Sequence, residues 1–232
     1  MPKIDSKHYF TPALFKFMRE LKDNNERKWF NENKHRYIGD LKEPAMDFVL
    51  DFGQHLDGIS PHFKADPRGQ GGSLFRIYRD VRFSKNKDPY KTHTGIYFSH
   101  LAGKGVHTPG FYLNLEPKNN WVGLGIWRPD SPTLKSLRQH IADNPAKWRR
   151  VVNNKAFKEK FKVSGSSLIR PPKGFDPEHP LIDVLKMKDF TAVAPLKQSS
   201  VTSDAFMSDF VTTCRAGAPL VRLICQGINQ PF

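Results

Sequence analysis

The chain has 232 residues, of which 38% are hydrophobic and 26% are charged, and this composition excludes an intrinsically disordered protein. Lys and Arg number 37 against 23 Asp and Glu, so the formal net charge is +14 at pH 7. Such an excess favours polyanionic partners such as nucleic acids and phosphorylated metabolites, although it can also serve only to keep a protein soluble.

The sequence has no signal for export, for a membrane span or for a cofactor. The first residues include no apolar segment, and no run of about 18 apolar residues occurs, so we expect a cytoplasmic protein that does not bind membranes. Cys214 and Cys225 lie about three helical turns apart, too far for a disulfide, and we expect buried, reduced thiols. Zinc-type spacing, a P-loop and a dinucleotide fingerprint are missing, so we expect no metal and no cofactor.

Helical patterns dominate the first third of the chain. Thr11 and Pro12 predict a helix that begins at Pro12, with Thr11 as its N-cap, and ends at Asn24. A longer helical pattern follows from about Glu26 to Leu56, and Pro44 must kink or interrupt it. Residues 66–72 are rich in glycine and predict a loop.

The middle of the chain is strand-like. Phe75 and Ile77 alternate with polar residues, which predicts a strand there, and a second strand is predicted over residues 93–101. Residues 110–116 and 121–127 flank a short polar turn, so they predict a β-hairpin.

Helices are predicted again after Pro129, the first with Ser131 as its N-cap. Further helical patterns cover about 145–161, 180–188 and 203–228, the last interrupted at Gly217 and Pro219, and strands are predicted near Leu168 and over 190–196. This order predicts one α+β domain over residues 1–232, with a central antiparallel sheet and helices from both the N- and C-terminal parts packed around it.

The segment from Ser73 to His93 is the strongest indication of a binding site. It holds six cations, against only Asp80 and Asp88, and aromatic residues are interleaved with them. Guanidinium groups suit planar recognition of phosphate or carboxylate, so we interpret the segment as an anion site with phosphate as the leading candidate. The alternative is that Arg79 and Arg82 form internal ion pairs. The predicted anion contacts are Arg76, Arg79, Arg82, Lys85 and Lys91.

The same region offers candidate catalytic groups. His93 follows several cations that lower its pKa, and a neutral imidazole can be a general base, with Asp80 to orient it and Tyr90 to donate a proton. On the predicted hairpin, Gly123 and Gly125 face one side, where they allow either close packing or a floor for a flat ligand that stacks on Trp127.

Several of these motifs together resemble a known family. The motif RIYRDVRFSKNKDPYKTH, with NNERKWF before it and WVGLGIWRP, SPTLKSLRQHI and LIRPPKGF after it, is similar to domain-of-unknown-function family twenty-four sixty-one. The resemblance runs from about Phe10 to the C-terminus, although VGLGIW stands where family members often have three glycines. It implies a single α+β domain found mainly in bacteria and in some fungi, with no biochemical activity to carry over.

Three functional hypotheses follow. The first is a cytosolic protein whose basic cleft binds a phosphate-bearing ligand, either a nucleotide, a phosphorylated metabolite or a nucleic-acid segment. The second is an enzyme that acts on a small phosphorylated or carboxylated substrate through Asp80, Tyr90 and His93. The third is an interaction protein whose basic face docks an acidic partner. The sequence carries no signal for an oligomeric state.

Overall fold

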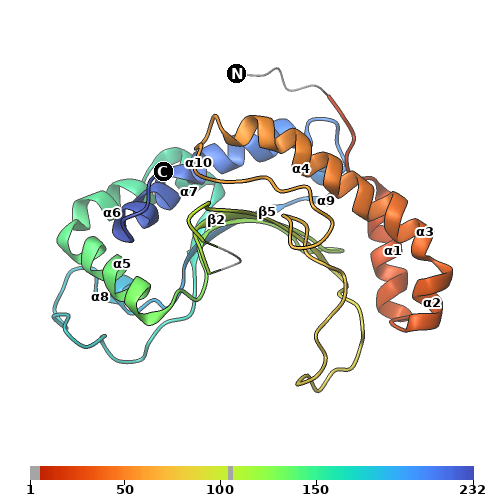
Figure 1. Cartoon of the computed structure of the whole chain (residues 1–232). Coiled ribbons are helices and arrows are strands. Elements are labelled where there is room, and N and C mark those ends of the chain that lie inside the picture. Colours follow the sequence, from red (N-terminus) through yellow and green to blue (C-terminus); the bar gives the residue numbers. More distant parts are fainter. Residues whose placement is uncertain (1–5, 104–106) are drawn as a thin grey trace.

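A twisted antiparallel sheet forms the centre of the molecule (Figure 1), as a computed structural model that describes residues 6–103 and 107–232 shows. The strand order is β1-β2-β3-β5-β4. The strands are β1 Thr94–Ser99, β2 Gly110–Leu115, β3 Asn120–Ile126, β4 Lys162–Ser164 and β5 Phe190–Leu196. Helices from both the N- and C-terminal parts of the chain pack against the sheet, so the predicted α+β class is confirmed.

The N-terminal helices follow the local signals closely. They are α1 Pro12–Asp23, α2 Arg27–Glu32, α3 Lys34–Arg36, the π-helix η1 Tyr37–Lys42 and α4 Glu43–Leu56. Thr11 caps α1 as predicted, because its Oγ1 accepts a hydrogen bond from the backbone N–H of Ala13 at 3.3 Å. Pro44 lies in the first turn of α4, directly after the wider π-helical turn. This turn accommodates the proline, which has no N–H to donate.

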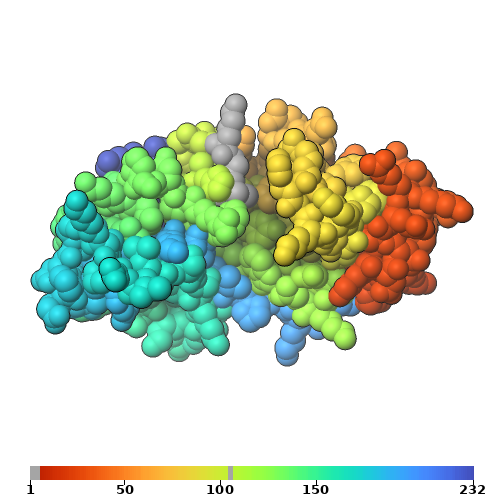
Figure 2. All heavy atoms as spheres, turned by 90° about the horizontal axis from the view of Figure 1, so that it is seen from below, coloured from red at the N-terminus to blue at the C-terminus, as the bar shows by residue number. Residues whose placement is uncertain are grey.

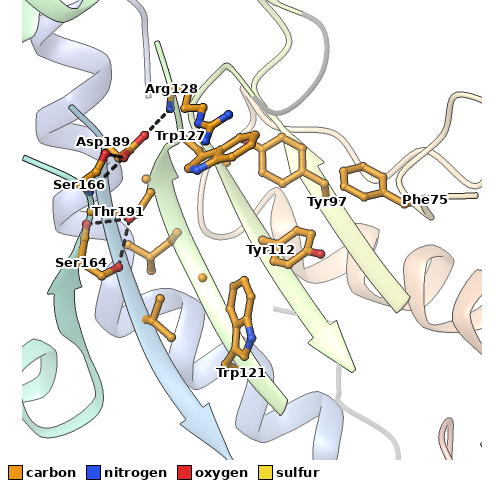
Figure 3. A pocket seen from close by; sticks show the side chains of 16 residues that line it. Phe75, Tyr97, Tyr112, Trp121, Trp127, Arg128, Ser164, Ser166, Asp189 and Thr191 are labelled. Atoms are coloured by element: carbon orange, nitrogen blue, oxygen red, sulfur yellow. Dashed lines mark hydrogen bonds between the residues drawn. The ribbon is translucent and has the colours of Figure 1, made fainter. Parts of the chain in front are cut away.

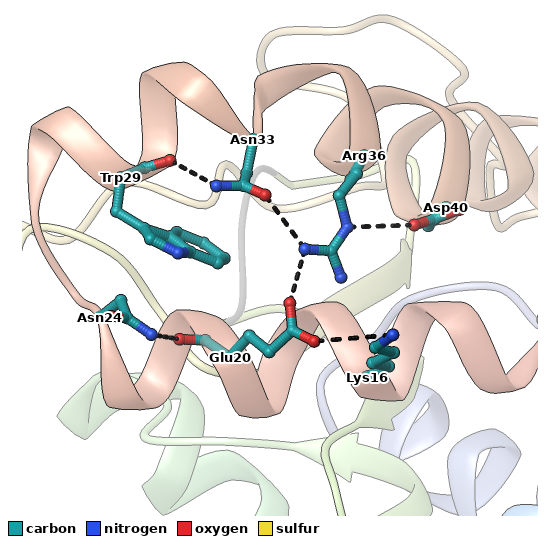
Figure 4. A network of polar contacts seen from close by, with 7 residues as sticks. All are labelled: Lys16, Glu20, Asn24, Trp29, Asn33, Arg36 and Asp40. Atoms are coloured by element: carbon teal, nitrogen blue, oxygen red, sulfur yellow. Dashed lines mark hydrogen bonds and ion pairs between the residues drawn. The ribbon is translucent and has the colours of Figure 1, made fainter.

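A polar network ties α1 to the helices after it (Figure 4). The Arg36 guanidinium donates to the Glu20 carboxylate at 2.5 Å and to Asn33 Oδ1 at 3.0 Å, and it lies 4.0 Å from the Asp40 carboxylate. The hydrogen bond from Arg36 lowers the pKa of Glu20. The network therefore fixes how the first helix packs against α3 and η1.

The C-terminal half adds α5 Ser131–Asp143, α6 Pro145–Val152, α7 Lys155–Lys160, α8 Ile182–Leu185, α9 Gln198–Val201 and α10 Phe206–Gly227. The N-cap of α5 is Asp130 and not Ser131, because the Asp130 carboxylate accepts from the Thr133 N–H at 2.9 Å. Beside Leu168, where a strand is predicted, the structure has an isolated bridge between Ser167 and Met187, and the short strand β4 lies earlier in the chain. None of the described helices is long and apolar enough to cross a membrane.

The predicted interruption of the last helix is wrong, since α10 runs through both Gly217 and Pro219. Pro219 removes one backbone donor, but packing against the sheet supports the helix. Gly217 is required by that packing, because a Cβ there would collide with the Leu124 side chain and would lie 3.1 Å from Phe161. Cys214 and Cys225 on this helix are buried free thiols, as expected.

The hydrophobic core fills the space between the helices and one face of the sheet. Phe98 of β1 contacts Phe52 of α4, with ring centroids 4.5 Å apart, and Phe210 of α10 at 6.1 Å. Alternate residues of β2 and β3, such as Phe111 and Val122, are fully buried on the same side. The helices α4 and α10 thus cover the convex face of the sheet (Figure 1).

The opposite face of the sheet is concave and is not covered by a described helix (Figure 1). Seen from below, it is a hollow between the segment that contains residues 73–93, drawn in yellow, and the parts drawn in green on the other side (Figure 2). Successive side chains of a strand point to opposite faces of the sheet, so the side chains that do not enter the core lie here.

The segment of residues 73–93 is not the strand that the sequence predicts around Phe75 and Ile77. It is an irregular hairpin held by isolated bridges between Leu74 and Ile96 and between Tyr78 and Tyr90. Its outer part is stabilised by bonds from side chains to the backbone, such as Lys87 Nζ to the Val81 carbonyl at 3.0 Å. These local bonds replace a regular ladder and let the segment project beside the concave face (Figure 1).

Candidate functional site

A cavity of about 620 Å³ lies on the concave face of the sheet (Figure 3). Its centre is aromatic, and polar side chains from β4, β5 and the residues beside them form one edge. The aromatic lining residues are Phe75, Tyr97, Tyr112, Trp121 and Trp127, and the polar ones are Arg128, Ser164, Ser166, Asp189 and Thr191.

Glycines allow the aromatic side chains to lie across the sheet. Tyr97 of β1 extends over Gly110 of β2, and Tyr112 of β2 extends over Gly95 of β1, so a Cβ on either glycine would collide with a ring. A Cβ on Gly123 would lie 2.8 Å from the Trp121 ring. These three glycines therefore allow the aromatic rings to lie close to the backbone of the sheet, and the rings above them form the floor of the cavity.

The floor is one connected aromatic surface. Trp121 contacts Tyr112, with ring centroids 5.0 Å apart, and Tyr112 lies 5.9 Å from Phe75. Phe75 in turn lies 6.4 Å from Tyr97. The surface thus runs from the middle strand of the sheet to the start of the basic segment, and it offers more than one ring for stacking.

Trp127, the predicted stacking residue, lines the cavity and is 44% exposed. Its ring already has two partners within the protein. The His107 ring is nearly parallel to it at 5.9 Å, and the Arg128 guanidinium lies 4.6 Å from its centroid. Its role towards a ligand stays a prediction, while Trp121 and Tyr112 form the central floor.

Asp189 holds the polar edge of the cavity together through hydrogen bonds. Its buried carboxylate accepts hydrogen bonds from the Arg128 N–H at 2.8 Å and from the N–H and hydroxyl of Ser166 at 3.1 and 2.7 Å. Burial by itself would raise the pKa of Asp189, but these hydrogen bonds hold it below its usual range. The carboxylate is therefore ionised, and it holds Arg128 in a left-handed backbone conformation with φ of 46°.

A second cavity, of about 610 Å³, adjoins the first, because Phe75 and Tyr97 line both. It lies against the glycine-rich loop of residues 66–72 and is lined by Lys64, Arg68, Arg76 and Lys91. Asp66 is its one acidic lining residue among the described positions. Asp66 binds Arg68 at 2.6 to 3.1 Å, and these bonds lower the pKa of Asp66 to about 2.

Two of the predicted anion contacts, Arg76 and Lys91, meet in this second cavity. Lys91 Nζ donates to the backbone carbonyl of Arg76 at 3.0 Å and lies 5.7 Å from the centroid of Phe75. Within the described part of the chain, neither cation forms an ion pair with a carboxylate. Burial and, after it, the charge of Arg76 lower the pKa of Lys91. Both effects destabilise the charged form of Lys91, and a bound anion would stabilise it.

The other predicted anion contacts lie on the outer part of the segment and do not line either cavity. Arg82 binds the Asp80 carboxylate through two hydrogen bonds of 3.0 and 2.7 Å. Arg79 donates to the Asp88 carbonyl at 3.2 Å and lies 3.9 Å from its carboxylate. Lys85 is exposed.

The three candidate catalytic residues do not share a hydrogen bond or an ion pair in the described structure. Asp80 is engaged by Arg82, which lowers its pKa to about 2. Tyr90 is 3% exposed and stacks on Phe30 at 4.0 Å, and burial raises its pKa. His93 is half-buried, and this burial lowers its pKa, in the direction that the sequence predicts but chiefly for a different reason.

Comparison with models of known protein families identifies the family of the chain. The model described as "Conserved hypothetical protein (DUF2461)" matches residues 13–223. The chain belongs to the DUF2461 family. This match confirms the resemblance that the central motif indicates. No curated protein matches the chain significantly.

Several residues of the site in this DUF2461 protein are not predicted by its sequence. Tyr97, Tyr112 and Trp121 form the floor, Lys64 lies just before the glycine-rich loop and Arg68 lies within it. The signal that points to the floor is the recurrence of glycine at alternate strand positions beside aromatic residues. Within the described residues, no group of three or more His, Cys, Asp or Glu side chains is arranged to hold a metal ion.

Proposed function

We propose that this DUF2461 protein binds a phosphate-bearing ligand that also carries a flat ring. The ring would lie on the aromatic floor at Trp121 and Tyr112, and the phosphate would lie between Arg76 and Lys91. The observation that carries the proposal is that the aromatic cavity and the basic cavity share Phe75 and Tyr97. One ligand can therefore use both.

Phosphate is the group that best suits the basic cavity. Arg76 and Lys91 form no ion pair with a carboxylate among the described residues, and a bound anion would offset the burial and the charge of Arg76 that lower the pKa of Lys91. Charge-assisted hydrogen bonds to phosphate oxygens are stronger than neutral ones. The neighbouring glycines of residues 69–72 allow a ligand to approach the backbone closely.

The two alternative hypotheses predict different behaviour. An enzyme that uses His93 as its base would turn a bound substrate over, with activity that His93→Gln abolishes. A protein that docks an acidic partner would bind polyglutamate as well as it binds nucleotides, since charge alone would then govern association.

Calorimetric titration with adenosine monophosphate tests the proposal. We expect binding of one ligand per chain, and we expect Arg76→Met or Lys91→Met to weaken it by about tenfold or more, as the loss of a charge-assisted hydrogen bond implies. Inorganic phosphate should bind more weakly because it lacks the ring.

The matched control is Arg82→Met, which removes a cation of the same segment that does not line the cavities. It should leave binding of the mononucleotide unchanged. Thermal melts should show all three variants folded. Absence of binding to the wild type, or equal affinity of the wild type and the Arg76 and Lys91 variants, would contradict the proposal.

A further inference from the structure

Phe83 is 95% exposed at the outer part of the basic segment. The Arg82 guanidinium lies 5.8 Å from its ring centroid, and Lys85 and Lys87 follow in the sequence. Single exposed apolar side chains are common on protein surfaces. This one differs because it is an aromatic ring beside a guanidinium group, in a segment rich in cations, and this combination can stack a base beside a phosphate.

The segment that carries Phe83 begins inside the basic cavity. Phe75, Arg76 and Lys91 line that cavity, and the chain between them extends outward through Arg79 and Arg82. In the view from below, this segment forms a wall of the hollow (Figure 2). Cations and aromatic rings therefore continue from the floor, through the basic cavity, to the surface.

The capacity of the site also exceeds that of one nucleotide. Each of the two adjoining cavities, of about 620 and 610 Å³, is within the range that a whole drug-sized ligand occupies. The floor offers several rings in contact, from Trp121 to Phe75. A ligand of several linked rings and phosphates fits this arrangement better than a mononucleotide.

We propose that the ligand is a single-stranded nucleic-acid segment of several nucleotides, an inference that rests on the proposed function. One base lies on the floor at Trp121 and Tyr112, its phosphate lies at Arg76 and Lys91, and the strand continues along the basic segment to a second stacking position on Phe83. A sheet face with aromatic rings and a basic rim is a general solution for binding unpaired bases. RNA and DNA share this chemistry.

The test compares ligands of increasing length. Thymidine monophosphate and oligothymidylates of two, four and six nucleotides, with the matching uridylates, are titrated into the full chain at low and moderate salt. Affinity should rise at least tenfold from the mononucleotide to the hexanucleotide. Its fall with salt should be steeper for the hexanucleotide, because more phosphates release counterions.

Phe83→Ser separates the two stacking positions. It should weaken hexanucleotide binding about fivefold or more, as the loss of one stacked base implies, and leave mononucleotide binding unchanged. Leu50→Ser is the matched control, because Leu50 is an exposed apolar residue on α4, which covers the convex face. It should change neither affinity.

The outcomes are distinct. Equal affinity for the mononucleotide and the hexanucleotide, or no effect of Phe83→Ser, would overturn the polymer inference and leave the proposed function standing. Failure of every nucleotide to bind would overturn both. Polyglutamate binding as tight as hexanucleotide binding would overturn the inference in favour of an acidic protein partner. A rise of affinity with length that is larger for uridylates than for thymidylates, or the reverse, would support it and show whether the strand is RNA or DNA.

Discussion

At the scale of residues, the site depends on which cations of the basic segment form an ion pair with a nearby carboxylate. Arg82 is two residues from Asp80 and binds it, and Arg79 is held by Asp88. Arg76 and Lys91 form no ion pair in the described structure, and the irregular hairpin brings them together. The sequence predicts the surplus of positive charge but not which cations are paired. The pairing depends on a turn, and the meeting of Arg76 and Lys91 depends on contacts between residues that are distant in the sequence.

The pKa of Asp66 in the glycine-rich loop predicts how the stability of the protein changes at low pH. The folded pKa of Asp66 is about 2, below its ordinary value, because Arg68 donates hydrogen bonds to it. The unfolded chain therefore takes up this proton at a higher pH. The stabilising contribution of Asp66 is present above about pH 4 and is lost as the pH falls towards 2.

Asp66→Asn should lower the free energy of unfolding at pH 7 by about 1 kcal/mol or less, since Arg68 is exposed. It should also make the loss of stability between pH 4 and pH 2 shallower. Urea unfolding at a series of pH values measures both. Asp183→Asn is the control, because Asp183 is largely exposed and pairs with Lys186 on the surface. Parallel curves for the wild type and Asp66→Asn would refute the assignment.

At the scale of elements, local signals predict local structure. The Thr11 cap, the hairpin of β2 and β3 and the strand β5 are all confirmed. The irregular hairpin of residues 73–93 and the continuous α10 are not predicted, because side-chain bonds to the backbone and packing against the sheet decide them. Gly217 shows this clearly, since in sequence it resembles a helix breaker and in the structure it is a packing contact.

Replacing Gly217 by alanine tests that contact. Overpacking against Leu124 and Phe161 should cost about 1–3 kcal/mol, partly offset by the better helix propensity of alanine, so we expect a net loss of about 1 kcal/mol. Gly39→Ala in η1 is the matched control, because a Cβ there meets nothing within 4 Å. Denaturant unfolding should show Gly39→Ala to be neutral or stabilising. A Gly217→Ala protein as stable as the wild type would contradict the close approach of α10 and β3.

At the scale of the whole molecule, the two faces of the sheet have different roles. The helices α4 and α10 bury the convex face, and the concave face carries aromatic rings above glycines beside a basic cavity (Figure 3). Sequence patterns predict the sheet, the helices around it and the basic segment. They do not predict that the two cavities adjoin, because this follows from how the hairpin of residues 73–93 folds beside the sheet.

The central claim is that a nucleotide stacks on the concave face. Its most direct test is the indole N–H resonances of the four tryptophans in an NMR titration with adenosine monophosphate, with Trp121 assigned through Trp121→Phe. We predict that the Trp121 resonance shifts with saturation, while those of Trp148, which is buried on α6, and Trp29, which lies on α2, stay in place. Lys91→Met should suppress the shift. A titration that leaves Trp121 unmoved, or that moves only Trp29 or Trp148, would contradict the account.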